Sequence, residues 1–169
     1  TLYSLEPDGK TNWRYHLKVE ISVRPVISSD EIIYAGTKNQ IYAIDDYGIT
    51  LWEDQDYYIS GFFGCALAED EKTVYAGSDE LIAYDTGDGE VKWALDVNNN
   101  SPVIGTNNII YTGNVRGRLI AVDSGGEKKW NKNVMRAPFV SYNPIVIGKG
   151  SNFYFNDFSK IYSYTNSGN

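Results

Sequence analysis

Residues that build metal sites, disulfides and reactive thiols are scarce in this chain of 169 residues. It contains one cysteine, Cys65, and one histidine, His16, which excludes an internal disulfide, a zinc site and a Cys–His catalytic pair. Cys65 lies in an apolar run, so we expect a buried, inert thiol. The run Asp85–Glu90 resembles a calcium loop only superficially and lacks the downstream ligand spacing, which predicts a turn. The sequence therefore predicts no metal site and no catalytic residue.

Long apolar runs and helical patterns are also missing. No run is long enough to cross a membrane, no signal peptide is evident, and no window repeats its apolar residues at the period of a helix. Lysine and arginine number 15 against 22 aspartates and glutamates, for a net charge of −7. An acidic chain is a poor general partner for nucleic acid or anionic lipid. We therefore expect no nucleic-acid binding and no direct membrane insertion.

What the chain does have is a repeat marked by tryptophan. Its four tryptophans stand 39, 41 and 37 residues apart, and each follows a glycine by four positions. A unit that recurs through a whole domain must bury its apolar face on the next unit. The glycines of the repeat turns are Gly9, Gly48, Gly89, Gly126 and Gly168, the last without a following tryptophan.

Each unit contains short apolar runs that are typical of strands. Runs such as Ile33–Gly36 and Ile41–Asp45 are rich in Ile and Tyr, and Gly, Asn, Asp and Ser separate them, which favours strands joined by tight turns. Four such strands in about 40 residues match a propeller blade. A β-sandwich does not repeat a turn glycine and a tryptophan at a fixed interval. We expect an all-β fold: a β-propeller with about four blades of four antiparallel strands.

The repeat does not coincide with the ends of the chain. Leu2–Glu6 aligns with the third strand of a unit, and Pro144–Thr165 supplies strands one to three. We expect residues 1–169 to be one segment of a larger propeller, cut within a blade at both ends. Two alternatives are a four-blade ring closed by the two ends of the chain, and a homodimer whose two copies complete a ring of about eight blades.

The spacing Ala-x-Asp-x-x-Gly-x-x-x-Trp occurs at Ala43–Trp52 and Ala121–Trp130, and with one more residue at Ala83–Trp93. In these motifs the chain resembles the pyrroloquinoline-quinone (PQQ)-like, tryptophan-docking propellers. The resemblance implies that each indole docks against the neighbouring blade and that the aspartate stabilises its turn. We expect Trp52, Trp93 and Trp130 to be largely buried on the outermost strands and to contact the adjacent blade. The docking tryptophans are Trp13, Trp52, Trp93 and Trp130, and the turn acids are Asp45, Asp85 and Asp123.

The resemblance leaves three functions open. Family members without a cofactor act as scaffolds or sensor domains, so the first is a non-catalytic protein-interaction module that is extracytoplasmic (periplasmic, cell-surface or secreted) and needs no cofactor. The second is part of a PQQ-dependent dehydrogenase, whose relatives carry a vicinal cysteine pair, a catalytic aspartate and calcium ligands; this chain has a single cysteine. The third is a cell-surface carbohydrate-binding module, which 14 tyrosines permit.

Candidate partner-binding residues lie mostly in the turns, because a propeller uses its strands for the core. Residues 53–90 hold eleven acids and one base, whereas residues 115–160 hold eight bases and three acids, a polarity that can steer a partner. Aromatic and arginine side chains are the usual anchors of protein interfaces. The candidates are Arg24, Tyr57, Tyr58, Phe62, Phe63, Arg116, Arg118 and Arg136.

Overall fold

The chain folds into short antiparallel strands, as its turn chemistry predicted. The computed structural model describes residues 1–17, 24–37, 40–54, 64–97, 101–114, 116–134, 145–148, 152–156 and 160–164. These residues form 17 strands and one short 3-10 helix, η1 (Thr106–Asn108). No helix in these ranges has the length and apolar character needed to cross a membrane. The all-β prediction is confirmed.

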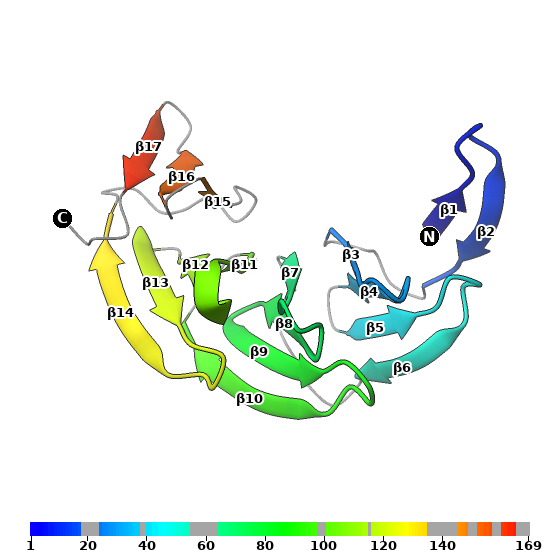
Figure 1. Cartoon of the computed structure of the whole chain (residues 1–169), viewed down its shortest axis with the longest axis horizontal. Coiled ribbons are helices and arrows are strands. Elements are labelled where there is room, and N and C mark those ends of the chain that lie inside the picture. The colour runs from blue at the N-terminus through cyan, green and yellow to red at the C-terminus, as the bar shows by residue number, and fades with distance from the viewer. Residues whose placement is uncertain are drawn as a thin grey trace.

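The strands form five sheets that follow one another along the chain (Figure 1), and we call them the first to fifth blades. Within each blade, strands that are consecutive in sequence pair with one another. The first blade contains β1 (Leu2–Leu5) and β2 (Thr11–Tyr15). The second contains β3 (Val26–Ile27), β4 (Ile33–Gly36), β5 (Ile41–Ile44) and β6 (Thr50–Asp54). The third contains β7 (Gly64–Leu67), β8 (Thr73–Gly77), β9 (Glu80–Asp85) and β10 (Val91–Asp96). The fourth contains β11 (Val103–Ile104), β12 (Ile110–Gly113), β13 (Arg118–Val122) and β14 (Lys128–Asn133). The fifth contains β15 (Val146–Ile147), β16 (Phe153–Asn156) and β17 (Ile161–Tyr164).

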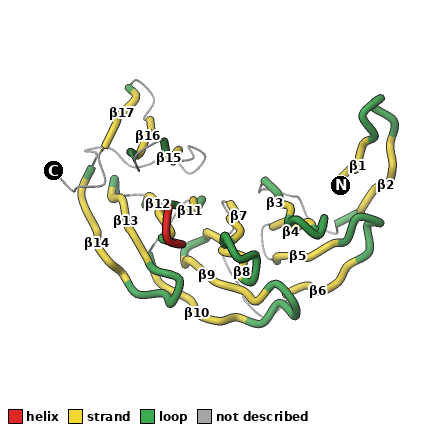
Figure 2. The backbone as a smooth tube through the Cα atoms, in the orientation of Figure 1, coloured by secondary structure: helices red, strands yellow, loops and turns green. Residues whose placement is uncertain are grey.

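The blades lie side by side in an open arc, with β6, β10 and β14 along its convex side (Figures 1 and 2). The first and fifth blades stand at opposite ends of the arc. Among the described strands, β1 pairs only with β2, and β17 pairs only with β16. The alternative of a four-blade ring closed by the two ends of the chain is therefore wrong for this structure. The reason is geometric: the rotation from one blade to the next is too small for five blades to close a ring, so β17 does not reach the first blade (Figure 1).

The hydrophobic core lies between adjacent blades. Tyr34 and Ile41 of the second blade pack with Val74 and Ile82 of the third, and two further clusters join the third blade to the fourth and the fourth to the fifth. All four residues of β5 are buried, since each of its faces meets a neighbouring blade. Burial on both faces explains why the central strands are continuous apolar runs and show no alternation.

A β-bulge precedes each tryptophan of the first four blades, a feature that the sequence did not reveal. In the second blade, Trp52 pairs with Ala43 while Thr50 pairs with Ile44, so Leu51 is the extra residue. Such a bulge bends the strand and redirects the side chain at the extra position. The equivalent residues are Asn12, Lys92 and Lys129.

Candidate functional site

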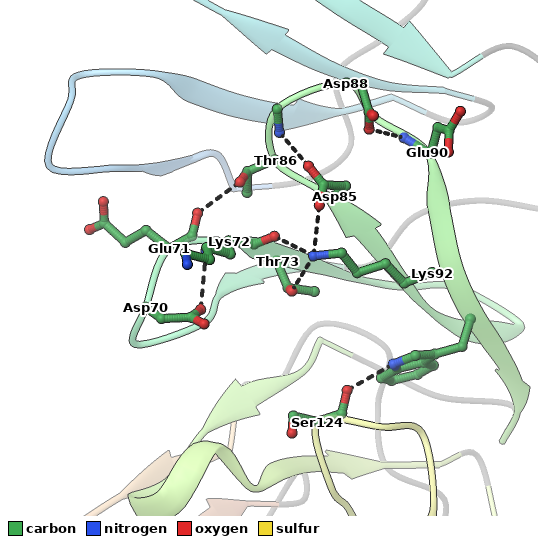
Figure 3. A network of polar contacts seen from close by, with 12 residues as sticks. Asp70, Glu71, Lys72, Thr73, Asp85, Thr86, Asp88, Glu90, Lys92 and Ser124 are labelled. Atoms are coloured by element: carbon green, nitrogen blue, oxygen red, sulfur yellow. Dashed lines mark hydrogen bonds and ion pairs between the residues drawn. The ribbon is translucent and has the colours of Figure 1, made fainter.

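Three tryptophans dock onto the turn of the following blade. In each case the indole N–H donates a hydrogen bond to the backbone carbonyl of the residue that follows the turn acid. The turn that would receive Trp130 lies outside the described residues. The N···O distances are 2.6 Å for Trp13 to Asp46, 2.9 Å for Trp52 to Thr86, and 2.9 Å for Trp93 to Ser124. Figure 3 shows the last of these contacts, at Ser124.

Only a minor part of each indole is exposed, so the expectation that Trp52, Trp93 and Trp130 would be largely buried is confirmed. They lie on the outermost strands, where part of each ring remains in contact with solvent. In the second, third and fourth blades a buried tyrosine from the second strand supports the indole of the same blade, and this contact follows from the repeated Tyr before a small residue and Gly. Desolvation raises the pKa of Tyr34 and of Tyr75. The ring-centroid distances are 5.9 Å for Tyr34–Trp52, 5.7 Å for Tyr75–Trp93 and 5.8 Å for Tyr111–Trp130.

The acid at the start of each turn accepts hydrogen bonds from the turn backbone. Asp85 Oδ1 accepts from the N–H of Gly87 at 2.8 Å, and its Oδ2 forms an ion pair with Lys92 Nζ at 2.9 Å (Figure 3). The hydrogen bond from Lys92 holds the pKa of Asp85 below its ordinary value of 3.8. Asp85–Glu90 is therefore a turn, as the sequence predicted, and a lysine of its own blade pairs with its first acid.

The residues present do not fit the quinone site of a PQQ-dependent dehydrogenase. Cys65 packs against the core between the second and third blades, and burial raises the pKa of its thiol to about 12. A thiol held in this protonated form is a poor nucleophile. The described residues contain no group of three His, Cys, Asp or Glu side chains that could hold a metal ion.

A polar cavity of about 260 Å³ lies between the third and fourth blades, and we call it the inter-blade pocket. The end of β10 forms one wall, and the β12–β13 turn with β13 and β14 forms the other. Three cationic side chains line it: Arg116, Arg118 and Lys128. The other lining residues are Asp96, Val97, Asn114, Ile120 and Asn131.

A buried asparagine positions the two arginines. Asn114 is 6% exposed, and its Oδ1 accepts the backbone N–H of Arg116 at 3.0 Å and of Arg118 at 3.1 Å. Its side-chain amide donates to the Val97 carbonyl of the third blade at 3.4 Å. Asn114 thus fixes the turn that carries both arginines and links that turn to the opposite wall of the pocket.

The charges of the pocket are specific to the fourth blade. Arg118 occupies the place that Gln40 and Glu80 hold in the second and third blades, and Lys128 occupies the place of Thr50. Lys128 Nζ donates to the Asp96 carbonyl at 3.0 Å. Within the described part of the chain, neither Arg116 nor Arg118 forms an ion pair. Since other blades form without them, these arginines are not required for the blade itself.

The structure brings together two of the candidates predicted from the sequence and separates a third. Arg116 and Arg118 share the inter-blade pocket, whereas Arg24 is exposed before β3 and does not line it. Sequence reasoning missed Lys128 and Asp96, although the departure of Lys128 from the repeat was a usable signal. The candidates that lie outside the described residues are Tyr57, Tyr58, Phe62, Phe63 and Arg136.

Comparisons with known proteins agree on a propeller. The family described as outer membrane protein assembly factor BamB matches residues 1–97. The solved structure of BamB from Moraxella catarrhalis superposes with a TM-score of 0.75 at 16% identity, over 94% of this chain and 51% of that one. This chain thus spans about half the length of that BamB. No curated protein matches the sequence.

Two further solved structures share the fold. A catalytically inactive variant of virginiamycin B lyase from Staphylococcus aureus, solved with quinupristin, superposes with a TM-score of 0.77 at 17% identity, over 98% of this chain and 59% of that one. The computationally designed Ika4 protein superposes with a TM-score of 0.72 at 14% identity, over 89% of this chain and 93% of that one. At such identities these likenesses concern the fold alone.

Proposed function

This chain belongs to the family of the outer membrane protein assembly factor BamB, which matches more than half of its length, and from that premise we propose that it is a non-catalytic protein-interaction module. The family description speaks of an assembly factor at the outer membrane, so we place the module outside the cytoplasm. A propeller presents rigid blades whose turns and inter-blade grooves are available for recognition. The partner is a protein, since assembly is contact between proteins.

The observation that carries the proposal is the inter-blade pocket. The repeated residues serve to dock one blade on the next, whereas Arg116, Arg118 and Lys128 depart from the repeat and gather around one cavity. Arginine is enriched in the energetically important centres of protein interfaces. Lys128 also binds the Asp96 carbonyl of the third blade, but the two arginines are not needed by the fold and are best explained by an external ligand.

Two enzymatic alternatives receive less support. The lyase relative is inactive when one of its histidines is replaced by alanine, whereas the single histidine here, His16, is exposed in the first blade and contacts Thr1 Oγ1 at 3.1 Å. His16 does not line the inter-blade pocket. The dehydrogenase alternative needs a cysteine pair that the chain does not have.

The carbohydrate-binding alternative is weakened because Tyr34, Tyr75 and Tyr111 are buried against tryptophans.

Site-specific photo-crosslinking tests the proposed function. A benzoylphenylalanine replaces Arg116 in the cells that make the protein, and the matched control replaces Arg14, an exposed arginine of the first blade. We expect one discrete protein adduct at position 116, which mass spectrometry identifies, and none at position 14. Adducts of equal yield at both positions, or none at position 116, would contradict the proposal.

The non-catalytic part is tested separately by titrating the chain with PQQ in the presence of calcium. We expect no stoichiometric binding by calorimetry and no shift of the quinone absorbance. Binding at a ratio of one quinone per chain would falsify this part and would restore the dehydrogenase alternative.

A further inference from the structure

We propose that the inter-blade pocket binds the carboxylate of an extended, acidic segment of the partner protein. This inference rests on the proposed function and names the chemistry of the surface that the partner presents. Arg116, Arg118 and Lys128 converge on one cavity together with a single acid, Asp96. The lining therefore has an excess of positive charge and attracts an anion.

The arginines are free to accept that anion. Neither guanidinium has an ion-pair partner within the described ranges, and Asn114 holds their backbone without using their side chains. A guanidinium presents a planar fork of N–H donors that matches the two oxygens of a carboxylate. The turn backbone that carries both arginines is thus fixed before the ligand arrives, which reduces the part of the entropy cost that comes from ordering the turn.

The floor of the pocket removes the ligand from bulk water. Val97, Asn114 and Ile120 line it and are 5%, 6% and 1% exposed, respectively. An ion pair formed against such a surface is stronger than one in open solvent, because the effective dielectric constant is lower. The Asn114 amide, the Asn131 amide and the Lys128 ammonium add hydrogen-bond donors at the same place.

The size of the pocket and its edge strand favour a peptide over a free anion or a cofactor. A cavity of about 260 Å³ is below the range of about 300–1,000 Å³ of small-molecule sites and suits one side chain. Lys128 and Asn131 lie on β14, the outermost strand of its sheet, and three of the six residues of β14 are lysines. These lysines oppose pairing with a neutral or basic strand, whereas an acidic extended segment can pair with such an edge. Asp96 also repels a phosphate dianion more than a carboxylate.

Fluorescence anisotropy with fluorescein-labelled hexaglutamate tests the inference on the 169-residue chain. We expect saturable binding that weakens by about tenfold in Arg118→Gln and by more in Arg116→Gln/Arg118→Gln, the scale of a lost charge-assisted contact. Arg118→Lys, which keeps the charge and loses the fork, is expected to bind at an intermediate level and guards against misfolding of the other variants. The matched control Arg14→Gln removes the same charge from the first blade and is expected to bind within about twofold of the unaltered chain.

The inference would be overturned by no binding of hexaglutamate, by equal weakening in Arg14→Gln, or by displacement of the peptide by inorganic phosphate at an equal concentration. Labelled hexaglutamine is expected not to bind, and its binding would overturn the need for a carboxylate. The outcome is separable from that of the proposed function. If position 116 gives an adduct but hexaglutamate does not bind, the proposed protein partner stands and the carboxylate inference fails. If hexaglutamate binds but no adduct forms, the carboxylate inference stands and the proposed protein partner fails.

Discussion

At Gly89 the missing side chain serves two purposes. Its φ of 78° lies in the left-handed region that favours glycine. A Cβ built there would also lie 2.6 Å from Cε3 of Trp52, the indole of the preceding blade. The spacing of glycine and tryptophan within one repeat therefore reflects a contact between two repeats. The indole of one blade rests on the glycine of the next, and its N–H binds the carbonyl of Thr86 in the same turn.

Gly89→Ala is expected to lower the free energy of unfolding by about 3 kcal/mol in urea denaturation. Roughly 1–2 kcal/mol comes from the left-handed backbone, and the remainder from displacing the docked indole. Gly9→Ala is the matched control, since Gly9 has a φ of 85° and an added Cβ would meet no atom within 4 Å there. Gly9→Ala is expected to lower the free energy of unfolding only by the contribution of the left-handed backbone, about 1–2 kcal/mol. Equal losses in the two variants would show that indole docking adds nothing.

At the scale of the element, the outermost strands share a bulge before the tryptophan but differ in the side chain of its extra residue. In β10 the extra residue is Lys92, and its ammonium reaches Asp85, Thr73 Oγ1 and the carbonyl of Lys72. The fourth blade repeats the ion pair with Lys129 and Asp123 at 2.8 Å. In β6 the extra residue is Leu51, which is 50% exposed. The bulge is thus a common backbone feature whose side chain decides whether a turn gains an ion pair.

Lys92→Leu is expected to reproduce the outer strand of the second blade and to lower stability near neutral pH by about 0.5 kcal/mol, since the pair is solvent-exposed. The folded pKa of Asp85 lies below its ordinary value of 3.8. Its contribution is therefore present above that value and is lost as the pH falls through the folded pKa. Urea denaturation at a series of pH values is expected to show a smaller acid loss in Lys92→Leu than in the unaltered chain. Asp85→Asn should show the same reduction, and an unchanged acid loss in both would contradict the role of the pair.

At the scale of the whole molecule, the arc leaves strand edges at its two ends (Figure 1). Among the described strands, β1 and β17 each pair with one neighbour only. Ile161 on β17 is 83% exposed and Leu5 on β1 is 60% exposed. Bare strand edges with apolar side chains promote association. The homodimer expected from the sequence as an alternative would cover these edges and complete a ring of about eight blades, and it stays a prediction.

Sedimentation of the 169-residue chain is expected to show a dimer at micromolar concentration. Ile161→Lys places a charge at the β17 edge and is expected to shift the chain towards the monomer, because edge charges oppose strand pairing. Tyr47→Lys changes a turn residue that is 75% exposed in the second blade and should leave the dimer intact. A monomer in the unaltered chain would contradict association through the edges.

The blade architecture was predictable because its signals are local and repeated. Turn glycines, β-branched runs and the tryptophan interval act within about 40 residues, so the order of strands and the position of each tryptophan on the outermost strand followed from the sequence. The resemblance to tryptophan-docking propellers supplied the docking of each indole on its neighbour. Arg116 and Arg118 were also identified, since arginines in the turns of a propeller are usual anchors of protein interfaces.

The inter-blade pocket was decided by tertiary structure alone. Asp96 ends β10 and Lys128 begins β14, and only the packing of the fourth blade on the third places them on facing walls. The bulges were equally hidden, because an extra residue changes the pairing register without changing the apolar pattern. The sequence determined what each blade is, since that depends on neighbours along the chain. The structure determined where charges from different blades meet, because that depends on how one blade is rotated and shifted on the next.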